Sequence, residues 1–104
     1  MSTDHPEGTA PVPAHSDGML LRTISHEGRF WDVFLEFKDD PRQLDTFRGL
    51  LCFCPVDNEM GEPARRTTTI FIEHSYEETV AKAQGLEEHQ LQGLLRSLLP
   101  DEGE

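Results

Sequence analysis

Apolar and polar side chains alternate along residues 29–38, which makes this stretch the clearest strand in the sequence. Successive side chains of a strand point to opposite faces, so apolar residues at every second position share one face. These residues are Trp31, Val33, Leu35 and Phe37. The stretch also contains the only tryptophan and three of the six phenylalanines. We therefore expect the hydrophobic core to lie beneath this strand.

Three further stretches have the β-branched and aromatic composition of strands. They span residues 19–25, 46–54 and 66–73. Residues 26–28 separate the first of them from the central strand, and Gly28 can adopt the positive φ that a tight hairpin requires. Residues 56–66 have little hydrophobicity and are predicted to form a long loop. No helical pattern intervenes, so the four strands are predicted to form an antiparallel meander.

The apolar period changes from 2 to 3.6 residues after the fourth predicted strand. Ser75 and Glu78 have the spacing of a capping box, in which the serine hydroxyl accepts from the backbone N–H of Glu78. A helical stripe follows at Tyr76, Thr79, Val80 and Ala83. Gly85 is expected to end this helix in the left-handed conformation. A second helix is predicted from residues 86–87 to Pro100, with the stripe Leu91, Leu94, Leu95 and Leu98.

Strands followed by helices predict an α+β domain: a four-stranded antiparallel sheet with two C-terminal helices packed on one face. Residues 1–18 combine several prolines with few apolar side chains, so we expect a disordered N-terminal arm. Residues 19–100 are predicted to form the single domain, and residues 101–104 an acidic tail.

The net charge of −11 argues against non-specific binding to nucleic acid, which requires a basic surface. The acid-rich, lysine-poor composition suits a halophilic source, and a GC-rich genome explains it equally well. The sequence starts without the basic and apolar regions of a signal peptide, and no apolar run approaches the ~20 residues of a membrane span. We therefore expect a cytoplasmic protein without nucleic-acid or membrane partners.

Cys52 and Cys54 are the first candidates for chemistry. Two residues apart on a strand, their side chains share one face, and His74 follows the next strand. These three residues are the weak candidates for a metal site, because the second ligand pair of a zinc signature is absent. Free cysteine usually packs as a small buried hydrophobe. The sequence therefore favours inert thiols and predicts no cofactor and no catalytic residue.

The two faces of the predicted sheet differ less than expected. The alternation assigns to the helix-covered face Trp31, Val33, Leu35, Phe37, Phe47, Leu51, Phe53, Ile70 and Ile72. The opposite face, which we call the open sheet face, should be polar if it contacts water. It nevertheless has an apolar centre with a charged rim, which is typical of a contact site. The predicted partner-binding residues are Phe30, Phe34, Arg48, Leu50 and Phe71.

Three alternatives to an exposed patch stay open. The arm can fold over the open sheet face, the sheet can curl into a half-barrel, or one strand can be displaced in register by one residue. With these alternatives in view, the sequence favours a small, acidic, non-enzymatic protein-interaction module. It would use the open sheet face to bind a second copy as a homodimer, or another protein as an adaptor. The alternative is a metal- or ligand-binding protein, or an enzyme, centred on Cys52 and Cys54.

Overall fold

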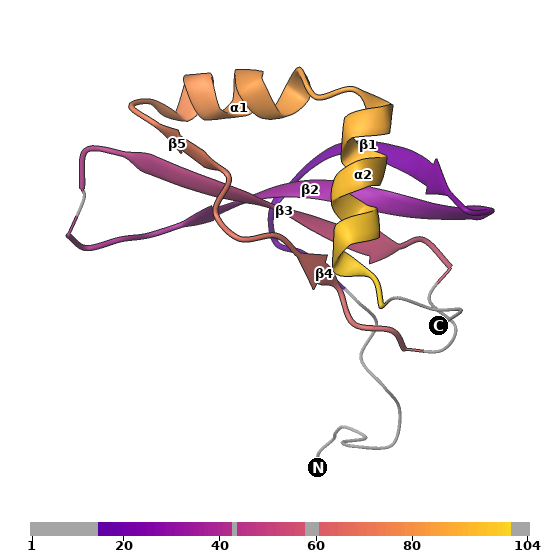
Figure 1. Ribbon diagram of the computed structural model, residues 1–104. Helices are drawn as coiled ribbons and strands as arrows, with labels where there is room; N and C mark the ends of the chain where they lie inside the picture. Colours follow the sequence, from indigo (N-terminus) through magenta and orange to yellow (C-terminus); the bar gives the residue numbers. More distant parts are fainter. Residues whose placement is uncertain (1–14, 43, 58–60, 101–104) are drawn as a thin grey trace, which may run out of the picture.

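The computed structural model describes residues 15–42, 44–57 and 61–100, which form an antiparallel sheet with two helices on one face (Figure 1). The predicted α+β fold is confirmed. The elements are β1 Met19–His26, β2 Arg29–Lys38, β3 Phe47–Pro55, β4 Arg65–Arg66, β5 Phe71–Glu73, α1 Tyr76–Gln84 and α2 Glu88–Leu98.

The first three strands form the predicted meander in the order β1-β2-β3. Glu27 and Gly28 have φ values of 52° and 82°, so the hairpin between β1 and β2 has positive φ at both central positions. This geometry matches the twist of the flanking strands, and glycine adopts it without steric cost. Strands β2 and β3 pair over most of their length, with Leu35 opposite Leu51 at the centre.

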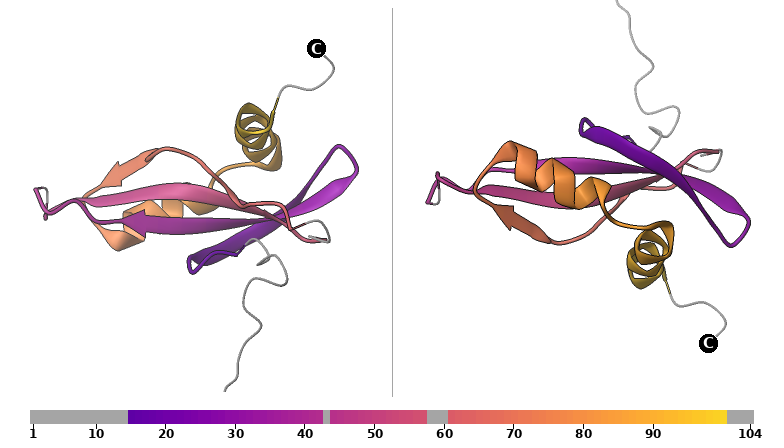
Figure 2. Two further views of the ribbon diagram at one scale, coloured as in Figure 1. Left: turned by 90° about the horizontal axis from the view of Figure 1, so that it is seen from below. Right: turned by 90° about the horizontal axis from the view of Figure 1, so that it is seen from above.

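The core lies between the sheet and the helices, as the alternation along β2 predicts. Trp31, Val33 and Leu35 are buried, and Leu91 and Leu95 of α2 join them. Seen from above in Figure 2, α1 runs along the sheet over β3 and β5, whereas α2 is viewed nearly end-on. The two helices therefore cover different parts of the same face.

Side chains fix where each helix begins. The predicted cap of α1 is present, because Ser75 Oγ accepts from the backbone N–H of Glu78 at 3.0 Å. The start of α2 is fixed by Gln90, whose Oε1 accepts from the N–H of Glu87 at 2.8 Å. Gly85 ends α1 as its C-cap, as predicted, but the predicted left-handed conformation is wrong: its φ of −80° is right-handed, and its N–H donates to the carbonyl of Ala81. Among the described residues, neither helix is long and apolar enough to cross a membrane.

The predicted fourth strand, 66–73, is not continuous. It divides into β4 and β5, which pair with different parts of β3, and residues 67–70 between them leave the regular ladder. The predicted facing of its second half is wrong as well. Phe71 is buried in the core, whereas Ile70 and Ile72 are 39% and 52% exposed.

Gly49 explains why Phe71 is the residue that faces the core. Gly49 lies opposite Phe71 on β3, and a Cβ built on it would lie 3.4 Å from the Phe71 ring and 3.1 Å from the methyl group of Thr79. The missing side chain thus leaves room for a phenylalanine ring and for α1 above it. The nearest neighbours of this position are Thr79, Leu35 and Phe71.

Candidate functional site

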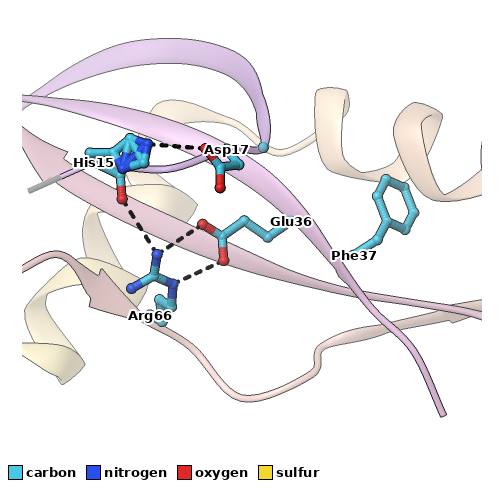
Figure 3. A pocket seen from close by; sticks show the side chains of 6 residues that line it. His15, Asp17, Glu36, Phe37 and Arg66 are labelled. Atoms are coloured by element: carbon cyan, nitrogen blue, oxygen red, sulfur yellow. Dashed lines mark hydrogen bonds and ion pairs between the residues drawn. The ribbon is translucent and has the colours of Figure 1, made fainter.

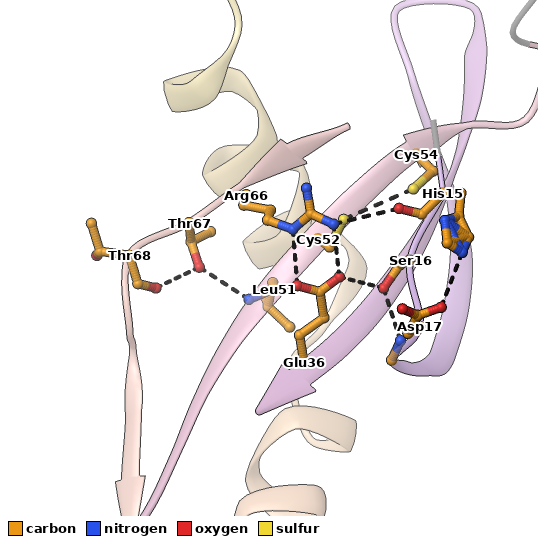
Figure 4. A network of polar contacts seen from close by, with 11 residues as sticks. His15, Ser16, Asp17, Glu36, Leu51, Cys52, Cys54, Arg66, Thr67 and Thr68 are labelled. Atoms are coloured by element: carbon orange, nitrogen blue, oxygen red, sulfur yellow. Dashed lines mark hydrogen bonds and ion pairs between the residues drawn. The ribbon is translucent and has the colours of Figure 1, made fainter. Parts of the chain in front are cut away.

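The centre of the open sheet face holds an ion pair in place of the predicted apolar patch (Figure 4). Arg66 of β4 donates from Nε to Glu36 Oε1 at 2.9 Å and from Nη2 to Glu36 Oε2 at 3.1 Å. Glu36 lies on β2, so the arginine side chain crosses over β3 to reach it. Cys52 of β3 is opposite Arg66 in the sheet register. The ion pair therefore covers the strand that was expected to expose apolar side chains.

Residues 15–18 extend this polar network (Figure 3). Ser16 Oγ donates to Glu36 Oε2, and the backbone N–H of Gly18 donates to Ser16 Oγ at 3.0 Å. A Cβ at Gly18 would overlap the carbonyl oxygen of Leu35, so only glycine lets the chain pass this close to β2. The last four residues of the predicted arm thus lie against the sheet, while residues 1–14 are outside the described part. A cavity of about 280 Å³ remains beside the Glu36–Arg66 pair.

The network holds Glu36 in its ionised form. Burial by itself raises the pKa of Glu36, but hydrogen bonds from Arg66 and Ser16 and the charge of Arg66 outweigh it. The pKa of Glu36 therefore lies below its ordinary value. The side chain of Glu36 is only 17% exposed, so water screens this pair less than it screens a surface ion pair.

Cys52 and Cys54 lie beneath this network with their sulfur atoms 3.9 Å apart. Burial, followed by the neighbouring Cys54 and Glu36, raises the pKa of Cys52 to about 12. Burial also raises the pKa of Cys54. Both groups are therefore protonated at neutral pH, and a protonated thiol is a poor nucleophile.

The third metal candidate, His74, is distant from the cysteines. It follows Glu73, which pairs with Phe47, and Phe47 is five residues from Cys52 along β3. Five residues of strand span about 16 Å. In the parts of the chain that the structure describes, no three His, Cys, Asp or Glu side chains converge as metal ligands do.

The five predicted partner-binding residues have different environments. Phe30 is 60% exposed, and Phe34 and Arg48 are half-buried. The expected exposure of the other two is wrong: Leu50 is on the open side but buried, and Phe71 is in the core under the helices. The open sheet face therefore does not carry one continuous apolar patch.

The largest exposed aromatic cluster lies at the end of the sheet where β2 leads into β3. The ring of Phe37 stacks on Tyr76 with 5.1 Å between centroids and meets Phe47 edge-on at 6.4 Å. These rings are 38–43% exposed, and the side chain of Leu44 beside them is 86% exposed. We call the cavity of about 540 Å³ that these four residues line the aromatic groove. Two acidic and two basic residues, Asp39, Asp40, Lys38 and Arg48, also line it.

Sequence reasoning missed the aromatic groove because it assigned Phe37 and Phe47 to the covered face. Their facing is as predicted, but the first residue of α1, Tyr76, covers Phe37 only in part, and both rings stay more than a third exposed. β2 has ten residues and is about 33 Å long, whereas the nine-residue α1 spans only about 14 Å. The lengths of the predicted elements alone would have indicated that part of the sheet stays uncovered.

One edge of the sheet is less available to a partner. Ser25 of β1 donates its N–H to Glu88 Oε2 at 3.1 Å, and its carbonyl accepts from Gln92 Nε2 at 2.6 Å. Side chains of α2 thus satisfy backbone groups that an edge strand otherwise presents to another chain. A partner is therefore more readily accommodated at the aromatic groove than at this part of the β1 edge.

Comparison with protein-family models, with curated proteins and with solved structures gave no match. The function therefore has to be inferred from the geometry described above.

Proposed function

We propose that this protein is a small, non-enzymatic interaction module that forms a homodimer through the aromatic groove. The observation that carries the proposal is the contact of three partly exposed aromatic rings beside the protruding side chain of Leu44. Aromatic side chains dominate the energetics of many interfaces, and a contiguous exposed apolar group typically marks a contact site.

The charges around the aromatic groove support a second copy of the chain as the partner. The whole protein has a net charge of −11, so two copies repel each other over most of their surface. The rim of the groove is balanced, with Lys38 and Arg48 against Asp39 and Asp40. A two-fold axis through the groove brings the basic residues of one copy toward the acidic residues of the other.

Leu44 has a specific role in this arrangement. It lines the groove but projects from it, with 86% of its side chain exposed. In a two-fold dimer, Leu44 of each protomer enters the aromatic groove of its partner, which buries both. Ten residues line the groove, fewer than the roughly 20–30 per partner of a standard stable interface, so we expect a dissociation constant around the micromolar range.

The open sheet face is the other location for the contact, and it was favoured by the sequence. Phe30 supports it, because this side chain is 60% exposed on that face. The alternative centred on the cysteines has less support. Both thiol pKa values are raised, and the thiolate is the form that reacts and binds metal.

The oligomeric state of three variants tests these locations. Light scattering after size-exclusion chromatography at about 10 µM to 1 mM should show a dimer of the wild type. Phe47→Glu should be monomeric and folded, because a charge in the groove opposes its burial. Phe30→Glu, the matched control on the open sheet face, should remain a dimer.

Leu44→Glu is a second groove variant that keeps the test valid if Phe47→Glu misfolds. Leu44 is almost fully exposed, so the substitution should not affect the fold. We expect it to weaken dimerisation at least about tenfold with an unchanged melting temperature at low concentration. A monomer in Phe30→Glu together with a dimer in Leu44→Glu would move the contact to the open sheet face. A wild type that stays monomeric at 1 mM would refute the homodimer.

A further inference from the structure

The first described residues of the chain are anchored to the open sheet face. They precede β1, and Ser16 Oγ donates to Glu36 Oε2 of β2. One residue earlier, the carbonyl oxygen of His15 accepts from Arg66 Nη2 at 3.4 Å. The chain is therefore held on this face at two consecutive residues, both bound to the Glu36–Arg66 pair or to one of its members (Figure 4).

The anchored residues also show in which direction the chain crosses the sheet. In Figure 3, Glu36 lies between His15 and Phe37, and Phe37 follows Glu36 toward the end of β2. Figure 4 agrees, because His15 lies on the side of Glu36 that faces the beginning of β2. A chain continued from His15 in this direction meets the first half of β2 and the residues beside it.

Two exposed apolar side chains lie at that end of the open sheet face. Phe30 of β2 is 60% exposed, and Val56, directly after β3, is 54% exposed. They are neighbours, because the backbone N–H of Val56 donates to the carbonyl oxygen of Phe30 at 2.9 Å. An exposed aromatic ring beside an exposed aliphatic side chain is a small apolar surface that a further segment can cover.

The sequence directly before His15 has the composition to cover this pair. Residues 10–14, which we call the apolar segment, read Ala-Pro-Val-Pro-Ala, whereas residues 1–9 are mostly polar. Proline fixes φ near −65° and has no N–H, so the apolar segment favours the extended polyproline II conformation and cannot pair regularly as a strand.

The lengths of the two elements also match. Residues 10–15 in the polyproline II conformation span about 19 Å, at about 3.1 Å per residue. The six steps along β2 from Glu36 back to Phe30 span about 20 Å. A chain that starts at the anchor of His15 is therefore long enough to bring the apolar segment onto Phe30 and Val56.

We propose that the apolar segment lies along the open sheet face of its own chain and packs against Phe30 and Val56. Proline-rich segments in the polyproline II conformation bind to aromatic side chains because little conformational entropy is lost on binding. The docked segment closes the open sheet face to other proteins and leaves the aromatic groove free. The inference therefore does not depend on the proposed homodimer.

The aromatic groove is the other apolar surface that suits a proline-rich segment. The position of the anchors argues against it, because Phe37 lies on the far side of Glu36 from His15 (Figure 3). To enter the groove, the chain would have to reverse its direction directly before His15. The open sheet face requires no such reversal.

Nuclear magnetic resonance of the valine methyl groups tests the docking in the full-length protein. The chain has four valines, Val12, Val33, Val56 and Val80, and only their methyl groups are protonated in a deuterated sample. We expect a nuclear Overhauser effect between Val12 and Val56. The methyl signals of Val12 should also have a ring-current shift that is lost in Phe30→Leu.

Two charge variants show whether the apolar character of the segment is responsible. Val12→Asp places a carboxylate in the apolar segment, so the segment should leave the face and the methyl signals of Val56 should move. Thr9→Asp adds the same charge one residue outside the segment and should leave the signals of Val56 unchanged. Neither position belongs to the folded core, and circular dichroism establishes that both variants are folded.

Isotopic dilution distinguishes docking within one chain from docking on a second copy. The labelled protein is mixed with a tenfold excess of fully deuterated protein. The effect between Val12 and Val56, per labelled molecule, should be unchanged. An effect that disappears on dilution would assign the segment to the face of another copy and overturn the proposal.

The same spectra recorded on Leu44→Glu separate this inference from the homodimer. We expect the Val12–Val56 effect to persist in this variant, whether or not the wild type dimerises through the aromatic groove. The proposal fails if Val12 shows no effect to Val56 and its methyl signals coincide with those of a peptide of residues 1–18. It also fails if Thr9→Asp and Val12→Asp shift the signals of Val56 equally.

Discussion

Arg66 holds both carboxylate oxygens of Glu36, at 2.9 Å and 3.1 Å, across the strand that carries Cys52. This pair joins β2 to β4, two strands with no ladder of their own between them. It also explains why the open sheet face can hold a partly buried carboxylate, because Arg66 and Ser16 supply the hydrogen bonds that burial would otherwise leave unmade.

Removing the charge of Glu36 should destabilise the protein in a pH-dependent way. The folded-state pKa of Glu36 lies below its ordinary value of 4.5. A carboxyl with a lowered folded-state pKa adds stability above the unfolded pKa and loses it as the pH falls through the folded value. Glu36→Gln should therefore cost about 1 kcal/mol at pH 7.

Urea unfolding at a series of pH values from 7 down to 3 measures the difference in unfolding free energy between wild type and Glu36→Gln. The gap between wild type and Glu36→Gln should narrow below pH 4.5 as the wild-type carboxyl takes up its proton. Asp45→Asn, an exposed carboxylate outside the network, serves as the control. A difference that is constant over this range would mean that the charge of Glu36 does not cause the loss of stability.

The two thiols should resist modification in the folded protein. Because the pKa of Cys52 is about 12, only roughly one molecule in ten thousand carries its thiolate at pH 8. We expect a thiol reagent such as 5,5′-dithiobis(2-nitrobenzoate) to react at least about a hundredfold faster in guanidinium chloride than under native conditions.

The single variants Cys52→Ser and Cys54→Ser assign the residual native reactivity to one sulfur atom. Rapid native labelling of Cys52 at a stability unchanged from wild type would contradict its burial. Both variants should also be less stable than wild type, because a buried hydroxyl without an assured partner is unfavourable.

Packing of α2 on the sheet should account for much of the stability. Leu95 is 0% exposed, so Leu95→Ala removes a buried side chain, leaves a cavity and should cost about 2–5 kcal/mol. Leu94 is only partly buried at the edge of the same cluster, and Leu94→Ala should cost clearly less. Chemical denaturation measures both. Equal losses, or no loss in Leu95→Ala, would mean that α2 packs on a different face.

The sequence by itself determined the elements whose causes are local. The alternation along β2 identified its buried face, because a strand directs every second side chain to the same side. The spacing of Ser75 and Glu78 identified the start of α1, because a cap requires only a hydroxyl and an N–H three residues apart. The stripe with Leu91 and Leu95 predicted the buried side of α2 for the same local reason.

Only the tertiary structure decided which face each residue of 70–72 takes. Ile70, Phe71 and Ile72 are all apolar and strand-forming, so their local pattern fits either facing. The choice depends on Gly49, a residue far away in sequence that leaves space for one ring. The exposed rings of the aromatic groove and the Glu36–Arg66 pair have the same kind of cause. The exposure of the rings depends on how far α1 extends over the sheet, and the ion pair depends on which strands become neighbours. Contacts between segments that are distant in sequence determine both arrangements.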